Sequence, residues 1–161
     1  MAILEIKKYP DPILRKKCQE VKKITEEIKN LCQDMIETMI RKEGVGLAAP
    51  QVGQLKRIIV VKFEDGPKAF INPQILSKSK EMEVAKEGCL CLPGIRLNVK
   101  RGKSILVKAQ GIEGREIEVK AEGLIARIFQ HEIDHLNGVL FIDKVGLWQR
   151  LKIKKELKNI K

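Results

Sequence analysis

The chain has 161 residues, a length typical of one domain that buries a continuous core without disulfides or a structural metal. Hydrophobic residues make up 43% and charged residues 33%, and no segment is long and apolar enough to cross a bilayer. Because the N-terminus also lacks the pattern of a secretory signal, we expect a single cytoplasmic domain over residues 1–161.

The charge is strongly basic, with 32 lysine and arginine residues against 21 acidic residues and a net charge of +11. Such an excess favours contact with polyanions, and ribosomal RNA near the exit of the nascent chain is a candidate. Aromatic residues are only 4%, which argues against a stacking platform for single-stranded nucleic acid. We therefore interpret the charge as an indication of location and not of activity.

Residues 1–21 are expected to form an arm over the core, because the run Tyr9-Pro10-Asp11-Pro12 cannot be helical. The clearest helix follows, since apolar residues recur at helical spacing from Ile24 to Met39. Acidic residues favour its start, basic residues favour its end, and Gly44 stops it.

Residues 44–53, with the sequence Gly-Val-Gly-Leu-Ala-Ala-Pro-Gln-Val-Gly, are dense in small side chains and resemble neither a core strand nor a core helix. Glycines allow a ligand or another chain to approach the backbone closely. A simple loop explains the glycines but not the Ala-Ala-Pro-Gln run. This segment is therefore a candidate wall of a functional site.

Two antiparallel hairpins are predicted by β-branched and alternating stretches, and they comprise residues 57–63 with 68–72 and residues 104–109 with 115–120. The run Ile71-Asn72-Pro73 is expected to close the first hairpin. Residues 75–85 are ambiguous, with a further strand carrying exposed charges as one interpretation.

The C-terminal part is predicted to be helical. One helix begins at about Ala121 and ends at Asn137-Gly138, and the basic residues 145–161 form a terminal helix that is partly docked and partly lysine-faced. The resulting fold class is α+β, with mixed, mainly antiparallel sheets packed around a central metal-binding helix and with a C-terminal helix.

The only two histidines, His131 and His135, lie in the run Gln-His-Glu-Ile-Asp-His at residues 130–135. Residues four apart share one helix face, so both imidazoles can reach one metal with Glu132 beside them, as in metal-dependent hydrolases. Leu124 and Ile128 continue the same inward stripe. The alternative is a helix that buries two hydrogen-bonded histidines, but their spacing around a glutamate favours a metal.

A catalytic metal needs a third protein ligand and an open position for water. Asp143 and Glu156 are the downstream acidic candidates, but Cys89, a soft thiolate in a glycine-rich segment, is better. Cys91 competes with it. If this stretch is extended, we expect Cys89 and Cys91 on opposite sides, so that only one thiol readily faces the metal, and their spacing is too tight for an easy mutual disulfide.

Three segments together resemble the signature motifs of the peptide deformylase family in order and spacing, and the resemblance covers nearly the whole chain. They are Gly-Val-Gly-Leu-Ala-Ala-Pro-Gln at residues 44–51, Glu-Gly-Cys-Leu at residues 87–90 and Gln-His-Glu-Ile-Asp-His at residues 130–135. Cys91 departs from the family, in which serine is usual. A second thiol there can compete for metal or raise sensitivity to oxidation.

The resemblance implies removal of the N-formyl group from the N-terminal formyl-methionine of newly made polypeptides, with release of formate. It implies Cys89, His131 and His135 as metal ligands. A metal-bound water then attacks the formyl carbon, with Glu132 as general base and acid.

Further roles follow from the same resemblance. Gln51 and the backbone N–H of Leu90 bind the oxygen of the formyl carbonyl, and the backbone of Gly46 contacts the substrate chain. The pocket for the methionine side chain falls at Val45, Leu124 and Ile128. Less specific expectations concern Arg96 and Arg101, which lie near the site in the family. Independently of the resemblance, Asp134 points away from the metal if His131 and His135 face it, so we expect it to orient a ligand or to fix the helix.

The family implies ferrous iron, Fe(II), as the metal, while coordination chemistry alone makes zinc, Zn(II), the default and also allows Ni(II) or Co(II). N-formyl-methionyl nascent peptides are the expected partners. The ribosome is expected to associate through the basic surface and the tail from Lys152 to Lys161, without membrane contact or sequence-specific nucleic-acid binding.

Two other functions stay open at this point. One is an H-E-x-x-H zinc endopeptidase that cuts internal bonds, and the other is a basic ribosome-binding domain with a structural metal. Structural sites are usually closed by four protein ligands, whereas only three convincing ligands appear here.

Overall fold

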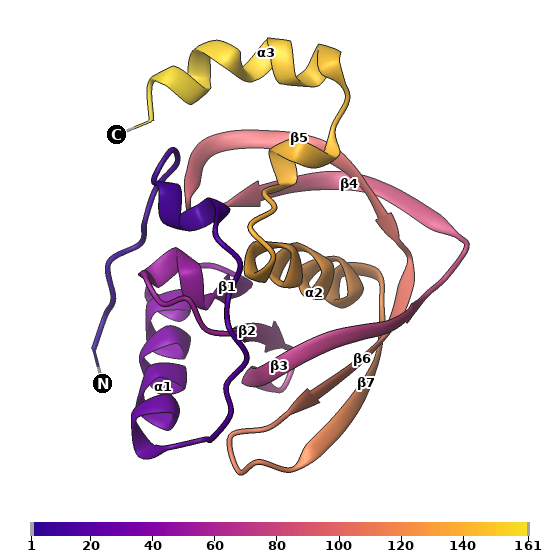
Figure 1. Cartoon of the computed structure of the whole chain (residues 1–161). Coiled ribbons are helices and arrows are strands. Elements are labelled where there is room, and N and C mark those ends of the chain that lie inside the picture. Colours follow the sequence, from indigo (N-terminus) through magenta and orange to yellow (C-terminus); the bar gives the residue numbers. More distant parts are fainter. Residues whose placement is uncertain (1, 161) are drawn as a thin grey trace.

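The computed structural model describes residues 2–160, and its strands and helices form layers around one central helix (Figure 1). Met1 and Lys161, the ends of the predicted domain, lie outside the described residues. The helices are α1 (Glu26–Arg41), α2 (Gly123–Leu136) and α3 (Leu147–Lys158), with short 3-10 helices η1 (Pro12–Arg15), η2 (Ala49–Val52) and η3 (Phe141–Lys144). The strands are β1 (Gly46–Ala48), β2 (Ile58–Phe63), β3 (Gly66–Lys78), β4 (Met82–Cys89), β5 (Leu92–Gly102), β6 (Ser104–Gln110) and β7 (Glu116–Glu122).

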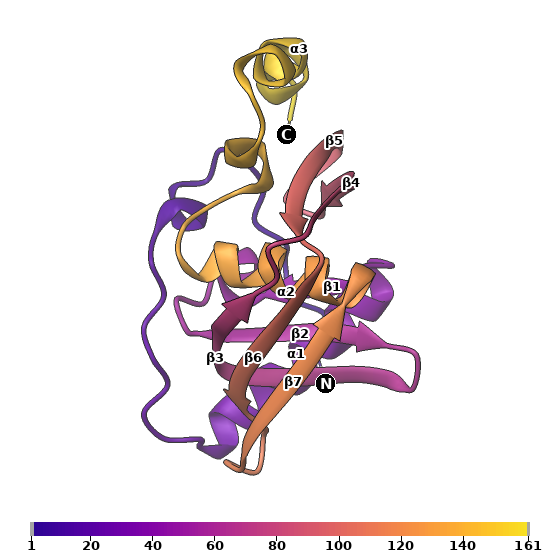
Figure 2. The same ribbon diagram turned by 90° about the vertical axis from the view of Figure 1, so that its right-hand side faces the viewer.

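Two sheets are formed, one with the order β1-β2-β3-β6-β7 and one that pairs β4 with β5. Every pairing between these strands is antiparallel. Helix α2 lies between the larger sheet and the β4–β5 hairpin, while α3 stands apart from the larger sheet beside β5 (Figures 1 and 2). The α+β fold with mainly antiparallel sheets and a C-terminal helix is thus confirmed.

Strand β2 explains how the layers are held together. Its side chains alternate between two faces, and both faces are buried. Ile59 and Val61 pack with α2 in one apolar cluster, whereas Ile58 and Val60 pack with α1 in a second cluster. A continuous apolar run is the pattern expected of a strand covered on both sides.

The predicted N-terminal arm does pack over the core. The N–H of Lys7 donates to the carbonyl of Gln51 at 2.7 Å, and the N–H of Cys18 donates to the carbonyl of Leu136 at 2.8 Å. The arm is not wholly extended, because η1 begins at Pro12 and buries Leu14. Proline is tolerated there because the first helical N–H has no intrahelical partner.

The first α-helix, the second hairpin and the terminal helix are confirmed by α1, by β6 with β7 and by α3. Helix α2 begins at Gly123, two residues after the predicted start, and ends as predicted before Asn137 and Gly138. Among residues 2–160, no helix combines the length and apolarity that spanning a membrane requires.

The prediction that the first hairpin ends at Ile71-Asn72-Pro73 is wrong. Its second strand, β3, continues to Lys78 and pairs first with β2 and then with β6. The register shifts between Ile71 and Gln74, which accommodates the missing N–H of Pro73. Asn72 adopts a φ of 53°, and its side chain bonds both backbone groups of Val21 at 2.8 Å. The ambiguous residues 75–85 are divided between the end of β3 and the start of β4.

The prediction that residues 44–53 contain no core strand is also wrong, because β1 occupies residues 46–48 and is fully buried. Small residues are needed there. A Cβ on Gly46 would lie 2.7 Å from both Glu132 Oε1 and Ile128 Cγ2, so only glycine lets β1 approach α2 so closely.

Candidate metal centre

Two elements from distant parts of the sequence bring three metal-ligating side chains together. Helix α2 supplies His131 and His135, whose ring centroids are 5.1 Å apart, and β4 ends at Cys89. The Cys89 Sγ lies 3.3 Å from His135 Nε2. One ligand atom from each of the three residues lies within 4.8 Å of the others, so they can hold one metal ion.

The two acidic alternatives lie elsewhere. Asp143 pairs with Arg15, and Glu156 is exposed on α3. The preference for Cys89 over these downstream acids therefore agrees with the geometry, because the β4–β5 hairpin folds over the histidine-bearing face of α2.

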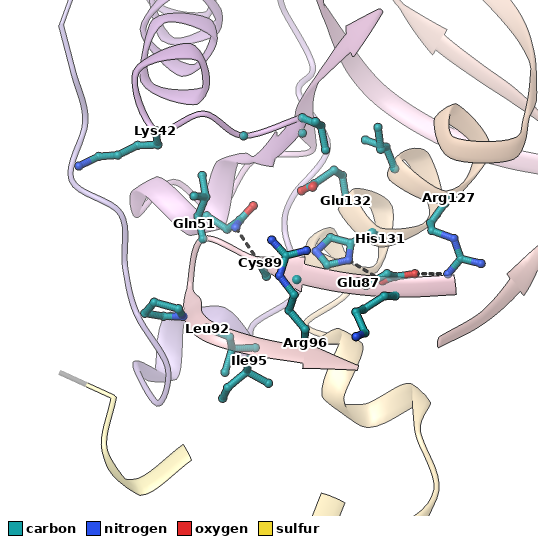
Figure 3. A pocket seen from close by; sticks show the side chains of 18 of the residues that line it. Lys42, Gln51, Glu87, Cys89, Leu92, Ile95, Arg96, Arg127, His131 and Glu132 are labelled. Carbon is teal, nitrogen blue, oxygen red and sulfur yellow. Dashed lines mark hydrogen bonds and ion pairs between the residues drawn. The ribbon is translucent and has the colours of Figure 1, made fainter. Parts of the chain in front are cut away.

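The donor set and its surroundings fit a metal. His131 Nδ1 lies 2.8 Å from Glu87 Oε1, which leaves Nε2 available as the ligand atom (Figure 3). Within the described part of the chain, two buried side-chain atoms have no hydrogen-bond partner, namely Glu132 Oε2 and His135 Nδ1. A cysteine and two histidines leave one coordination position open, which is typical of catalytic sites.

Glu87 anchors a buried group of charges behind the ligands. Its carboxylate accepts from Arg101 Nε and Nη2 at 2.9 Å each and from Arg127 Nη1 at 2.6 Å. Burial raises the pKa of Glu87, but the hydrogen bonds and charges of Arg101 and His131 outweigh burial and hold the pKa far below its usual range. The carboxylate is therefore ionised and orients His131.

Neither Glu87 nor Arg127 was assigned a role from the sequence, although simple periodicity places both. Glu87 precedes Cys89 by two residues on a strand, so both side chains point to the same face. Arg127 precedes His131 by four residues on a helix and shares its face. Arg127 also donates to the carbonyls of Val99 and Glu83, at 2.8 and 2.7 Å, and so ties α2 to the hairpin.

Arg101 also reaches Asp134, whose Oδ2 accepts from Nη1 at 2.5 Å. Asp134 is thus absent from the ligand group and is tied instead to the hairpin. Arg101 is buried, whereas Arg96 is exposed and lines the pocket in front of the ligands (Figure 3).

Glu132 lies beside the ligands and is almost fully buried. Burial is the main cause that raises its pKa to about 7, while the charge of His131 acts in the opposite direction. Its Oε1 packs against the backbone of Gly46, as the close approach of β1 requires.

Gln51 presents its amide nitrogen to the same site. Its Oε1 accepts from the N–H of Ala48 at 2.8 Å, and its Nε2 donates to Cys89 Sγ at 3.2 Å (Figure 3). The first bond fixes which end of the amide faces the ligands. Both Gln51 and Leu90 line the cavity.

A cavity of about 570 Å³ opens in front of these groups. It is lined by residues 42–46, by Gln51, by residues 86–90 and 92–96, and by five residues of α2 between Leu124 and Glu132. The residues expected to contact substrate all line this cavity, and they are Val45, Gly46, Leu124 and Ile128.

The expectation that Leu124 continues a buried stripe is wrong. Leu124 is 64% exposed, whereas Ile128 is 5% exposed. Because α2 begins only at Gly123, its first turn stands at the mouth of the cavity and not in the core. Val45, at 48% exposure, lies at the same mouth.

The expectation that the thiols of Cys89 and Cys91 lie on opposite sides is also wrong. Side chains two residues apart on an extended chain point to the same side, and here the two Sγ atoms are 3.2 Å apart at the turn that Leu90 and Cys91 form between β4 and β5. A hydrogen bond with Cys91 and burial raise the pKa of Cys89 to about 12, so a cation has to displace a proton to gain the thiolate. Cys91 itself is fully buried and does not belong to the ligand group.

Comparison with known proteins agrees with this geometry. The family model described as polypeptide deformylase matches residues 3–150. A peptide deformylase of Dictyoglomus turgidum is 54% identical over 142 residues, which cover 88% of this chain and 92% of the relative. A peptide deformylase of Thermotoga maritima is 48% identical over 155 residues, which cover 96% of this chain and 94% of the relative.

Solved structures share the fold as well. The crystal structure of the Thermotoga maritima peptide deformylase matches with a TM-score of 0.88 and covers 91% of this chain and 99% of its own. The crystal structure of a peptide deformylase from Legionella pneumophila matches with a TM-score of 0.92 at 38% identity and covers 98% of this chain and 94% of its own. The similarity therefore extends over the whole architecture, including the hairpin and α2.

Proposed function

The chain belongs to the polypeptide deformylase family, and we propose from its site geometry which residues perform the removal of the formyl group from nascent peptides. One observation carries this proposal: Cys89, His131 and His135 bring their ligand atoms within 4.8 Å of one another. Glu132 stands beside them with one carboxylate oxygen unpartnered. The residues from 1 to 161 act together as one catalytic domain.

Cys89, His131 and His135 hold a divalent metal. When bound, the metal supplies a water of lowered pKa and a Lewis acid for the formyl oxygen. Glu132 accepts the proton of the attacking water and returns it to the leaving amine, which releases formate and a free N-terminus. Its unpartnered Oε2 is the atom that takes the proton.

Two donors stabilise the oxygen of the formyl group as negative charge develops on it. They are Gln51 Nε2 and the backbone N–H of Leu90, both on the cavity wall. A preorganised donor of this type is typically worth about 3 kcal/mol in other enzymes. The bond from Ala48 to Gln51 Oε1 holds the amide in the donating orientation.

The substrate enters through the exposed mouth of the cavity. Val45, Leu124 and Ile128 surround the methionine side chain, and the backbone of Gly46 contacts the peptide. Removal of solvent from the exposed side chains of Leu124 and Val45 favours binding of an apolar first residue.

Fe(II) is the metal that we propose, with Zn(II), Ni(II) or Co(II) as replacements that the same donors accept. The protein acts in the cytoplasm and associates with the ribosome through its basic surface and C-terminal tail. Helix α3 supports the second point, because its lysines face solvent, namely Lys152, Lys154, Lys155 and Lys158.

The activity is tested by formate release from an N-formyl-methionyl peptide under anaerobic conditions, with the bound metal identified in the same sample. We expect formate and intact internal peptide bonds. Cleavage of internal bonds in unformylated peptides would support the endopeptidase alternative. The Glu132→Gln variant should keep its metal and lose activity, and full activity would remove Glu132 from its role.

The ligand assignment is tested by metal analysis of two cysteine variants. Cys89→Ala should lose the metal, whereas Cys91→Ser should keep it. The opposite result would assign the ligand role to Cys91.

Ribosome association is tested by deleting residues 152–161 and measuring binding to ribosomes at several salt concentrations. We expect weaker binding that falls with salt, because exposed charges are screened. Undiminished binding of the protein that lacks these residues would exclude a role of the tail in ribosome association.

A further inference from the structure

Cys91 has no role in the reaction described above, yet its thiol lies against the proposed ligand. The two Sγ atoms are 3.2 Å apart, and both cysteines are free thiols. Cys89 lines the cavity, whereas Cys91, which is part of the turn, is fully buried. A small oxidant that enters the cavity therefore meets Cys89 first and finds Cys91 in contact behind it.

We propose that Cys91 is a modification site, at which a peroxide converts the metal-free pair into a Cys89–Cys91 disulfide that thiol reductants reverse. The other two cysteines do not take part. Cys18 and Cys32 are buried in two different apolar clusters, and Cys91 belongs to a third.

The chemistry balances with hydrogen peroxide as the oxidant. The Cys89 sulfur attacks the peroxide, the O–O bond breaks, and Cys89 becomes a sulfenic acid while one water leaves. The Cys91 sulfur then displaces the sulfenic oxygen as a second water and forms the S–S bond. Two thiols and one peroxide give one disulfide and two waters.

Contact between the thiols favours this second step over further oxidation. A sulfenic acid without a neighbouring thiol proceeds to sulfinic and sulfonic acids, which thiol reductants do not reverse. Here the resolving thiol is already in place. Because a ring closed by cysteines two residues apart is small and constrained, the disulfide should be easily reduced.

The consequence for the enzyme rests on the proposed role of Cys89 as a ligand. A disulfide removes the thiolate from the site, so metal cannot reload until the bond is reduced. The pair thus converts an irreversible loss of Cys89 into a reversible one. Serine at position 91 cannot do this.

The test uses the full chain after its metal has been removed with a chelator. The protein is treated with hydrogen peroxide and digested with trypsin, which releases residues 87–96 with both cysteines in one peptide. We expect this peptide to lose two hydrogens and to regain them with dithiothreitol, after which the protein binds zinc again. A long incubation is needed, because the raised pKa of Cys89 slows its attack on peroxide. The peptides that contain Cys18 and Cys32 serve as internal references.

Cys91→Ser is the matched control, since serine and cysteine are similar in size. Its peptide should gain oxygen atoms, and dithiothreitol should not restore zinc binding. If the wild-type peptide gains oxygen and never loses two hydrogens, the proposal is overturned, even if the variant fails to fold. The mass change does not depend on deformylase activity, so failure of the proposed function would appear separately, as a reduced, metal-loaded protein that releases no formate.

Discussion

Helices α2 and α3 are close in length and lie in the same third of the chain, yet α2 is mostly buried and α3 is mostly exposed. Ten of the 14 residues of α2 are buried, against one of the 12 residues of α3. Three apolar residues of α3 are exposed, namely Leu147, Trp148 and Leu151. The difference comes from position, because α2 lies between two sheets, whereas α3 is covered on one side only, by β5 and η3 (Figure 2).

A helix that is buried between two layers can carry buried polar groups as well as apolar ones. Five buried residues of α2 are polar or charged, namely Arg127, Gln130, His131, Glu132 and His135. The hairpin supplies hydrogen-bond partners for all of them except Glu132. Gln130, for example, exchanges two hydrogen bonds with the backbone of Gly102, at 3.0 and 2.9 Å.

The largest expected effect is on the apolar face of α2. Phe129 is fully buried, and its ring centroid lies 4.9 Å from that of Phe70. Phe129→Ala should lower the free energy of unfolding by about 4 kcal/mol, because it leaves a cavity in the core. Trp148→Ala on α3 is the control, since Trp148 is 80% exposed and its loss should change stability by less than about 0.5 kcal/mol. Denaturant unfolding measures the free energy of unfolding of both variants, and equal losses would show that the two helices contribute alike to stability.

The next effect concerns the buried charges. Glu87→Gln should destabilise the protein by about 3 kcal/mol, because it leaves Arg101 and Arg127 buried without their carboxylate. Metal affinity should also fall, since His131 loses the partner that orients it. Glu81→Gln, which breaks the exposed pair with Lys103, should cost less than about 1 kcal/mol. Unfolding curves and metal titrations of both variants show whether a buried ion pair contributes more to stability and metal affinity than an exposed one.

A smaller effect is expected on α3, where Ile153 is the buried residue and packs with apolar residues of β5 and η3. Ile153→Ala should release α3 locally, because this helix has few other apolar contacts, and the rest of the fold should keep its stability. Hydrogen exchange of the α3 amides should therefore accelerate while that of the α2 amides does not. Faster exchange in both helices would show that α3 is part of the global folding unit.

The smallest effect depends on pH. Asp143, in η3 before α3, is partly buried, which raises its pKa, but the hydrogen bond and charge of Arg15 outweigh burial and lower the pKa below its usual value. A lowered pKa in the folded protein stabilises it above the unfolded pKa of about 4. That contribution is lost as the pH falls through the folded pKa. The stability difference between wild type and Asp143→Asn should therefore be present at neutral pH and shrink in acid, and a constant difference would contradict the assignment.

Much of the site could be predicted because the spacing of residues close in the chain indicates which side chains share a face. Two histidines four residues apart share a helix face, and Cys89 lies in a glycine-rich segment that allows close approach to a metal. The contact between Cys89 and Cys91 is also consistent with local spacing, because side chains two residues apart on an extended chain point to the same side, so the expectation of opposite sides was wrong. The burial expected for Leu124 could not be decided by helical periodicity, because it depends on where α2 enters the core.

Local patterns of residues predict the three α-helices, the two hairpins and the α+β class, because each rests on interactions between residues close in the chain. Packing between distant segments places Glu87, Arg101 and Arg127 in one buried group and brings β1 close to α2 at Gly46. These contacts join segments far apart in the chain. They depend on how the hairpin folds over α2, which no local pattern of residues specifies.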